Sequence, residues 1–227
     1  MIPFRDDVPA RRYPVVTVLL IIANIAVFLY QLSLPPSAAA AFVQRFGMVP
    51  GELTGIVALP SGPALLGVLT SMFLHGGWFH LVGNLWYLWL FGDNVEDRMG
   101  HFRFLAFYVL CGVAAAAVHV LSDPAGTVPA IGASGAISGV LGAYLVFYPF
   151  ARILTLVPLF FVWPVVELPA LLVLGSWFLV QILNGAAAFS ISNGTTGGVA
   201  WWAHVGGFAA GMILARIVAP ARRLRRY

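Results

Sequence analysis

Two residue types that together support acyl transfer occur inside otherwise apolar stretches of this sequence. Ser134 lies in GASG (132–135), and His204 lies in AHVGG. A serine hydroxyl becomes a useful nucleophile only when an adjacent base removes its proton, and a neutral imidazole suits that task. We therefore hypothesise that Ser134 is a nucleophile and His204 its general base. No Asp or Glu lies near His204 in the sequence, which favours a Ser–His dyad over a triad.

His80 and Asn84 form a second pair, in the stretch HGGWFHLVGN. They are four residues apart, so they share one face of a helix. Both side chains can donate hydrogen bonds, and with the backbone N–H of Ser134 they could stabilise the negative oxygen of a tetrahedral intermediate. An interhelical polar clamp is the alternative. His75 is predicted to have a structural role in orienting the preceding connection.

Ser134 also fits a purely structural interpretation, in which it is a small residue where two helices pack closely. Ser138 lies one turn later, and Gly207 and Gly211 give a matching small-residue stripe in the segment that carries His204. The two interpretations are compatible, because close packing would bring His204 within reach of Ser134. The small residues predicted to pack near the site are Gly135, Ser138, Gly207 and Gly211.

A metal site built from His75, His80 and His204 is a weaker alternative. The sequence has no HExxH motif, and no carboxylate lies close to these histidines. We predict neither a metal nor another cofactor. The single cysteine, Cys111, lies in an apolar run and is predicted to be a small buried hydrophobe.

The composition indicates that these residues belong to a membrane protein. Hydrophobic residues make up 61% of the 227-residue chain and charged residues only 9%, whereas an ordinary soluble domain is roughly 25% charged. The segments without any charged residue include 13–44, 53–92, 104–122 and 168–215. About 20 apolar residues are enough for a helix to cross the hydrocarbon core. We predict one all-α, polytopic membrane domain over 1–227, without a separate soluble domain.

Six transmembrane helices are predicted, at about 15–34, 79–92, 103–121, 134–149, 166–184 and 200–218. The first is interpreted as an uncleaved helix and not as a signal peptide, because its apolar run is long and Asp6 and Asp7 precede it. The apolar stretch LTLVPLFFVWP (154–164) contains two prolines and is predicted to be a connector or the entry to the fifth helix.

The arginines predict the orientation of this bundle. With six spans both termini lie on one side, and that side carries every arginine except Arg45. Such a bias indicates a cytoplasmic side. It also explains the net charge of +4 without nucleic acid as a partner. The tail ARRLRRY (221–227) is predicted to touch anionic lipid, and the membrane is predicted to be the bacterial inner membrane.

The second, fourth and sixth helices run in the same direction, so their N-terminal ends lie at one face of the membrane. These ends carry His80, Ser134 and His204. The fourth helix, about 24 Å long, is shorter than the hydrocarbon is thick. Irregular backbone before it must then enter the membrane, which is tolerated only beside protein or a water-filled cavity. We predict a hydrated depression above Ser134.

Taken together, these motifs resemble the rhomboid family of intramembrane serine proteases. The residues that carry the resemblance are RDDVPARRYPVVT, TSMFLHGGWFHLVGNLWYLWLFGDNVEDRMG, GASGAISGVLGAY and AWWAHVGGFAAG. The resemblance implies a six-helix core that cleaves single-pass membrane proteins in or near their transmembrane segments. It implies Ser134 as nucleophile, His204 as base, and His80, Asn84 and the Ser134 amide as oxyanion donors.

The same resemblance implies roles for the surrounding segments. Gly132 would line the site, and Gly207 and Gly211 would be the packing motif. The connection 185–199 is predicted to be mobile and to cap the site. The fifth helix would be a lateral gate, with Trp177 and Phe178 as its bulky residues.

Two positions depart from the pattern of some family members. The first connection, about 35–78, has neither Trp nor Arg in its stretch ALLGVLTS, so we expect it to pack differently, folded into the outer leaflet. Some members place a Tyr one turn after the serine, beneath the histidine. Here that position is Ser138, which leaves open how the imidazole of His204 is supported.

Two other functions compete with the protease interpretation. A catalytically inactive relative that binds membrane helices would be expected to lack the serine or the histidine, and this chain has both. A transporter would need a polar path through both leaflets. The cytoplasmic halves of the second and fourth helices (LWYLWLF, GAYLVFY) are instead apolar.

Overall fold

The computed structural model describes residues 1–57, 62–158, 161–191 and 199–219, and these are mostly helical. Three short strands also occur among them. In chain order the elements are β1 (Ile2–Asp6), α1 (Val15–Ser33), α2 (Pro36–Phe46), α3 (Pro50–Thr54), α4 (Gly62–Thr70), the 3-10 helix η1 (Ser71–Phe73), α5 (Trp78–Met99), α6 (His101–Ser122), α7 (Ser134–Phe147), β2 (Arg152–Leu156), β3 (Val165–Pro169), α8 (Ala170–Ile191) and α9 (Trp201–Val218).

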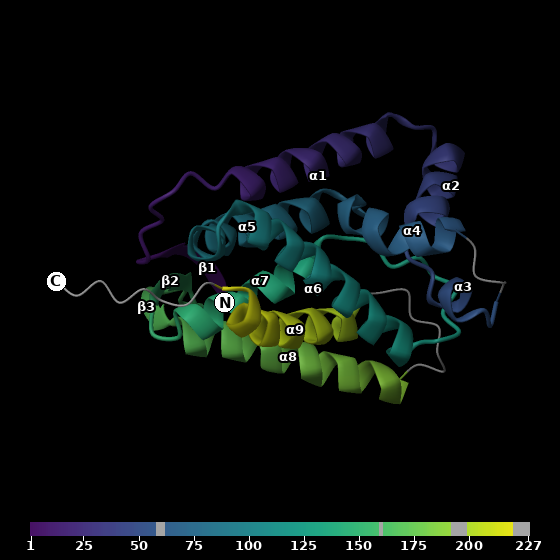
Figure 1. The fold of residues 1–227 in the computed structure, drawn as a ribbon. Coiled ribbons are helices and arrows are strands. Elements are labelled where there is room, and N and C mark those ends of the chain that lie inside the picture. Colours follow the sequence, from purple (N-terminus) through teal and green to yellow (C-terminus); the bar gives the residue numbers. More distant parts are fainter. Residues whose placement is uncertain (58–61, 159–160, 192–198, 220–227) are drawn as a thin grey trace.

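Helix α7 lies at the centre of the helical bundle, against α5, α6 and α9 (Figure 1). Its residues 136–144 are all buried. Helix α1 packs on the outer side of α5, and α8 packs on α9. The three strands lie at one end of the bundle, and α2, α3 and α4 lie at the other end (Figure 1). Ser134 is the first residue of α7 and lies at the end of this helix that is farther from the sheet.

Several helices have the length and composition that a membrane crossing requires. Among the described residues, four helices satisfy this by themselves: α1, α6, α8 and α9. A fifth candidate is the pair Ala64–Phe73 and Trp78–Met99, which is bent by 79°. Helix α7 is apolar but has only 14 residues. The chain is therefore an integral membrane protein of the all-α class, and the count of six crossings stays a prediction.

The helix boundaries differ from the predicted ones at three places. Helix α5 runs to Met99 instead of ending near 92, and α8 begins at Ala170 instead of 166. Helix α8 also continues to Ile191, so the first part of the connection predicted at 185–199 is helical. Its remainder, 192–198, lies outside the described residues. The connection predicted at 35–78 contains the helices α2, α3, α4 and η1, which the sequence analysis did not predict.

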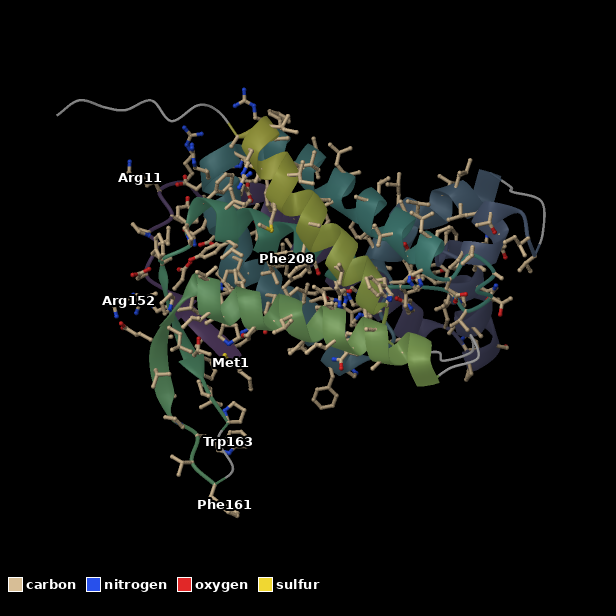
Figure 2. All side chains as sticks on the ribbon, turned by 90° about the horizontal axis from the view of Figure 1, so that it is seen from below. Met1, Arg11, Arg152, Phe161, Trp163 and Phe208 are labelled. Atoms are coloured by element: carbon tan, nitrogen blue, oxygen red, sulfur yellow. The ribbon has the colours of Figure 1, made fainter. Side chains whose placement is uncertain are left out.

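The sheet was not predicted from the sequence. The stretch expected to be a connector, 154–164, contains the end of β2 and leads to β3, and β2 pairs antiparallel with β3. Strand β1 adds on the other side of β2, with Ile2 opposite Leu156. Phe161 and Trp163 project from the hairpin away from the helices (Figure 2). The pairing of β1 with β2 joins segments distant in sequence and leaves no local signal, and the two prolines in 154–164 favoured a connector over a hairpin there.

Strand β1 is attached to the bundle by hydrogen bonds to two helices. The Tyr144 hydroxyl of α7 and the Asn94 amide of α5 donate to Asp6 Oδ2, at 2.5 and 2.9 Å. The indole N–H of Trp86 donates to the Pro3 carbonyl at 2.7 Å. Burial raises the pKa of Asp6, and the hydrogen bond from Tyr144 partly opposes this effect. These contacts fix the end of α7 that lies farthest from Ser134.

A buried carboxylate explains why α5 continues through the polar stretch DNVEDRM. Glu96 accepts hydrogen bonds from the backbone N–H groups of Val16 and Thr17, both at 2.8 Å, and from the Thr17 hydroxyl at 2.7 Å. These N–H groups open α1 and would otherwise lack partners. Oε1 of Glu96, the oxygen that accepts from Val16, also lies 2.5 Å from Nδ1 of His101. Glu96 thus joins α1 to α5.

Glycines let the backbones of α7 and α9 meet almost directly. A Cβ atom placed on Gly207 would lie 2.0 Å from the carbonyl oxygen of Gly135. One placed on Gly211 would lie 2.0 Å from the carbonyl oxygen of Gly139. A side chain at either position has no space unless the helices move apart, so the predicted small-residue stripes do lie at this interface.

We expect Gly211→Ala to destabilise the protein, because the added methyl must separate α9 from α7. Overpacking of this kind costs about 1–3 kcal/mol. For a chain of this size each kcal/mol lowers the unfolding midpoint by about 2–4 °C. The control is Gly175→Ala on α8, where a Cβ would meet nothing within 4 Å. Thermal unfolding in detergent measures both variants. Equal midpoints would contradict the glycine-contact interpretation.

Candidate active site

Ser134 and His204 lie in hydrogen-bonding contact. The Ser134 hydroxyl oxygen is 2.8 Å from Nε2 of His204. Ser134 begins α7, and His204 is in the first turn of α9. Both residues are next to the glycine contact, because Gly135 follows Ser134 and Gly207 lies one turn after His204. The close packing of α7 and α9 therefore sets the distance between hydroxyl and imidazole.

Aromatic rings surround the imidazole of His204, which is buried with 8% of its surface exposed. The Trp177 ring of α8 lies 5.9 Å away between centroids, at an interplanar angle of 35°. The Trp201 ring lies 6.3 Å away, edge to face. These contacts leave the ring few orientations other than the one that faces Ser134.

Gln181 is a polar neighbour of His204 that the sequence analysis missed. Its Oε1 atom lies 2.8 Å from Nδ1 of His204, on the opposite side of the ring from Ser134. Gln181 is on α8 and only 4% exposed. Its amide Nε2 also donates to the carbonyl of Trp177 at 3.2 Å. The signal was available, since a glutamine inside an apolar membrane helix marks a functional site by default.

Ser138 does not contact the imidazole of His204 through any described hydrogen bond. Its hydroxyl instead donates to the backbone carbonyl of Ser134 at 2.6 Å, within α7. The position one turn after Ser134 therefore holds a back-bonded serine. Among the described residues, Trp177 and Gln181 of α8 flank the imidazole of His204. These two residues, and not Ser138, therefore support the ring.

His80 and Asn84 face the loop that leads into Ser134. Gly132 in this loop has φ of +120°, which an L side chain rarely adopts. A Cβ on Gly132 would lie 2.5 Å from Nε2 of His80 and 3.6 Å from Nδ2 of Asn84. The Gly132 N–H donates to the Ser71 carbonyl at 2.9 Å, which holds the loop in place. The structure thus brings His80, Asn84 and Ser134 to one place.

His75 contacts Asn84 instead of Ser134. Its Nε2 lies 3.0 Å from Nδ2 of Asn84, and its ring meets His80 edge to face at 5.0 Å. Gln31 of α1 holds the backbone of His75, since Gln31 Oε1 accepts from the His75 N–H at 3.1 Å. This geometry is compatible with a supporting role for His75, in which it orients the Asn84 amide.

A cavity of about 1070 Å³ adjoins these groups. Ser134, His204, His80, Asn84 and Trp177 line it. The loop residues 125–131, which precede α7, form another part of the wall. The cavity lies where the short α7 predicted a depression. Within the described parts of the chain, no three His, Cys, Asp or Glu side chains are grouped as metal ligands.

The two residues predicted to form the gate differ in position. Trp177 lines the cavity and contacts His204. Phe178 stacks on Phe208 of α9, with 4.4 Å between ring centroids and an interplanar angle of 17°. Phe208 is labelled between α8 and α9 in Figure 2. Phe178 therefore contributes to the attachment of α8 to α9, while Trp177 faces the site.

We expect Ser134 to react with a fluorophosphonate probe, because His204 can accept its proton. His204→Ala is expected to reduce the labelling rate at least about 100-fold, and Ser134→Ala to abolish it. Ser33→Ala, which removes an exposed hydroxyl on α1, is the matched control. Gel fluorescence and peptide mass spectrometry measure the extent and position of labelling. Equal labelling of the His204→Ala variant would show that the contact does not activate the serine.

Comparison with known proteins places the chain in a family. A model described as the Rhomboid domain matches residues 63–221, which include the four site residues. RHOMBOID-like protein 5 of Arabidopsis thaliana is 33% identical over 65% of this chain and 42% of its own length. The chloroplastic Rhomboid-like protein 11 of the same plant is 31% identical over 67% of this chain and 52% of its own length.

A bacterial relative matches over a shorter part of the chain, at a higher sequence identity. The rhomboid protease GluP of Bacillus subtilis is 41% identical over 34% of this chain and 15% of its own length. The chain spans about half the length, or less, of these relatives. Because the Rhomboid domain covers more than half of the chain, the chain belongs to the rhomboid family of membrane proteins.

Proposed function

We propose that the protein is an intramembrane serine endopeptidase in which Ser134 and His204 act as a catalytic dyad. The observation that carries this proposal is the 2.8 Å contact between the Ser134 hydroxyl and Nε2 of His204. The pair is next to a large cavity and is flanked by two hydrogen-bond donors. A serine, a base and an oxyanion site are the minimum that acyl transfer requires.

The residues support a two-step reaction. His204 Nε2 takes the Ser134 proton while Oγ attacks the peptide carbonyl carbon, and the carbonyl oxygen becomes negative. His80, Asn84 and the Ser134 backbone N–H stabilise that oxygen. The C–N bond then breaks as His204 protonates the leaving amine. In the second step His204 activates water, which hydrolyses the acyl-enzyme and restores Ser134.

The substrates we propose are single-pass transmembrane proteins. A substrate helix hides its carbonyl groups in its own hydrogen bonds, so it must unwind locally before Ser134 can attack. Small or helix-breaking residues near the cleavage site would lower the cost of unwinding. Trp177, which lines the cavity on α8, is the residue such a segment would meet beside the site.

We also propose an orientation with both termini in the cytoplasm of a bacterial cell and the protein in its inner membrane. Strand β1 is at the sheet end of the bundle, where Arg11 and Arg152 also lie (Figure 2). Arginines concentrate on the cytoplasmic side of membrane proteins and can contact anionic lipid headgroups there. The cavity then lies toward the opposite, external face.

Purified protein in detergent should cleave a single-pass test substrate, and Ser134→Ala and His204→Ala should each lower the rate at least about 1000-fold. Ser33→Ala again serves as the matched control and should cleave normally. Gel electrophoresis and mass spectrometry give the rate and the cleavage site. If wild type cleaves no substrate but binds transmembrane segments, the protein is an inactive helix-binding member of the family. Cleavage by Ser134→Ala would reject Ser134 as nucleophile.

Asn84→Ala and His80→Ala test the proposed oxyanion site. Each is expected to lower kcat about 100-fold or more with little change in KM, because the donated hydrogen bonds strengthen only as charge develops. Gly132→Ala should act in the same direction, since its methyl would displace His80. Steady-state kinetics on the same substrate provide the measurement. A change confined to KM would instead assign these residues to substrate binding.

A further inference from the structure

Gln181 makes two hydrogen bonds that the Ser–His reaction does not account for. Its side chain is buried on α8, with Oε1 2.8 Å from Nδ1 of His204 and Nε2 3.2 Å from the Trp177 carbonyl. A buried glutamine in a membrane helix is costly unless its polar atoms are satisfied. Here both ends of the amide have partners, and one partner is the proposed base.

The Trp177 carbonyl determines which way the amide of Gln181 points. A backbone carbonyl only accepts hydrogen bonds, so the atom that faces it must be the NH2 group. The opposite orientation would set two oxygens against each other. The oxygen of Gln181 therefore faces the imidazole of His204, and it accepts but cannot donate.

This orientation in turn determines the tautomer of His204. Because Oε1 of Gln181 only accepts, Nδ1 must carry the proton. The neutral ring then has its lone pair on Nε2, which is the atom 2.8 Å from the Ser134 hydroxyl. The opposite tautomer would place an N–H against the serine, and the ring could not take its proton.

We propose that Gln181 is a positioning residue that holds His204 in the tautomer and orientation required of the general base. This inference rests on the proposed protease function and deepens it. Gln181 occupies the place of the third member of a triad, with a neutral amide instead of a carboxylate. It acts through His204 and touches no reacting atom.

The contact also joins two different helices. Gln181 and its support, the Trp177 carbonyl, both belong to α8, whereas His204 belongs to α9. The base is therefore correctly oriented only while α8 lies against α9. Any displacement of α8 by an entering substrate removes the acceptor, and the return of α8 restores it.

The neighbours of His204 make a pH profile a useful readout. The other titratable side chains that line the same cavity as His204 are His80, Tyr87, His119 and Asp123. Gln181 is neutral at every pH. Gln181→Glu would introduce a carboxylate at Nδ1, which stabilises the imidazolium and so extends its range to higher pH.

The test compares Gln181→Met, Gln181→Glu and the wild type by kinetics in detergent. Methionine has a similar length but accepts hydrogen bonds weakly, so kcat should fall about 10- to 100-fold with KM changed less than about twofold. Glutamate keeps an acceptor oxygen, so kcat should stay within about tenfold of wild type. The acid limb of its kcat/KM profile should move to higher pH. Ser176→Ala, also on α8 but bonded only to its own helix and Met1, is the matched control.

An isotope-labelled histidine NMR spectrum gives a readout that does not depend on cleavage. In the wild type, His204 should show the Nδ1-protonated tautomer, assigned by comparison with His204→Ala. In Gln181→Met it should show a mixture of tautomers. The inference is overturned if Gln181→Met keeps wild-type kcat, or if its His204 signals are unchanged. A purely structural role is indicated if Gln181→Met and Gln181→Glu lose stability and kcat alike with no shift in the pH profile.

The outcomes separate this inference from the proposed function. If wild type does not cleave, the proposed function fails, and the tautomer spectrum still tests the contact. If wild type cleaves, Ser134→Ala does not, and Gln181→Met cleaves normally, the protease proposal stands and the role of Gln181 is rejected.

Discussion

The contact between the backbones of α7 and α9 is the constraint on which the site depends. With glycine at 135 and 207, the two helix axes approach as closely as backbone atoms allow. Ser134 precedes the first glycine and His204 lies one turn before the second, so the same approach places hydroxyl and imidazole 2.8 Å apart. Without a hydrophobic driving force between helices in lipid, such close van der Waals packing is a main source of association. Stability and chemistry therefore rest on the same few residues.

Helices α7 and α8 are both attached to the sheet, at the end of α7 that lies farthest from Ser134. The Tyr144–Asp6 hydrogen bond attaches α7 to strand β1, and β3 leads without a break into α8. The sheet is thus a common base for α7, which carries the serine, and α8, which carries Gln181. The α8–α9 interface is formed by rings such as Phe178 and Phe208. Rings can slide past one another, whereas the glycine contact cannot loosen without separating backbones. The serine and histidine are therefore held rigidly, and the glutamine less so.

Much of this arrangement could be predicted from the sequence. Charge-free runs located the helices, and polar residues within them identified Ser134, His204, His80 and Asn84, because polar groups are costly in a bilayer. The sheet was missed because β1 and β2 are far apart in the chain, and because the prolines of 154–164 favoured a connector where β2 and β3 form a hairpin. Gln181 was missed for a related reason. Its partner His204 is on another helix, so the sequence around Gln181 does not indicate this contact, whereas Ser138, one turn after Ser134, bonds within α7.

The central claim is that the packed helix pair forms a working nucleophile with an oxyanion site beside it. The most direct test is a crystal structure of the protein after reaction with a fluorophosphonate, which mimics the tetrahedral intermediate. The account predicts phosphorus bonded to Oγ of Ser134, with the phosphoryl oxygen within hydrogen-bonding distance of His80, Asn84 and the Ser134 N–H. Phosphorus on another residue, or a phosphoryl oxygen directed away from His80 and Asn84, would contradict it.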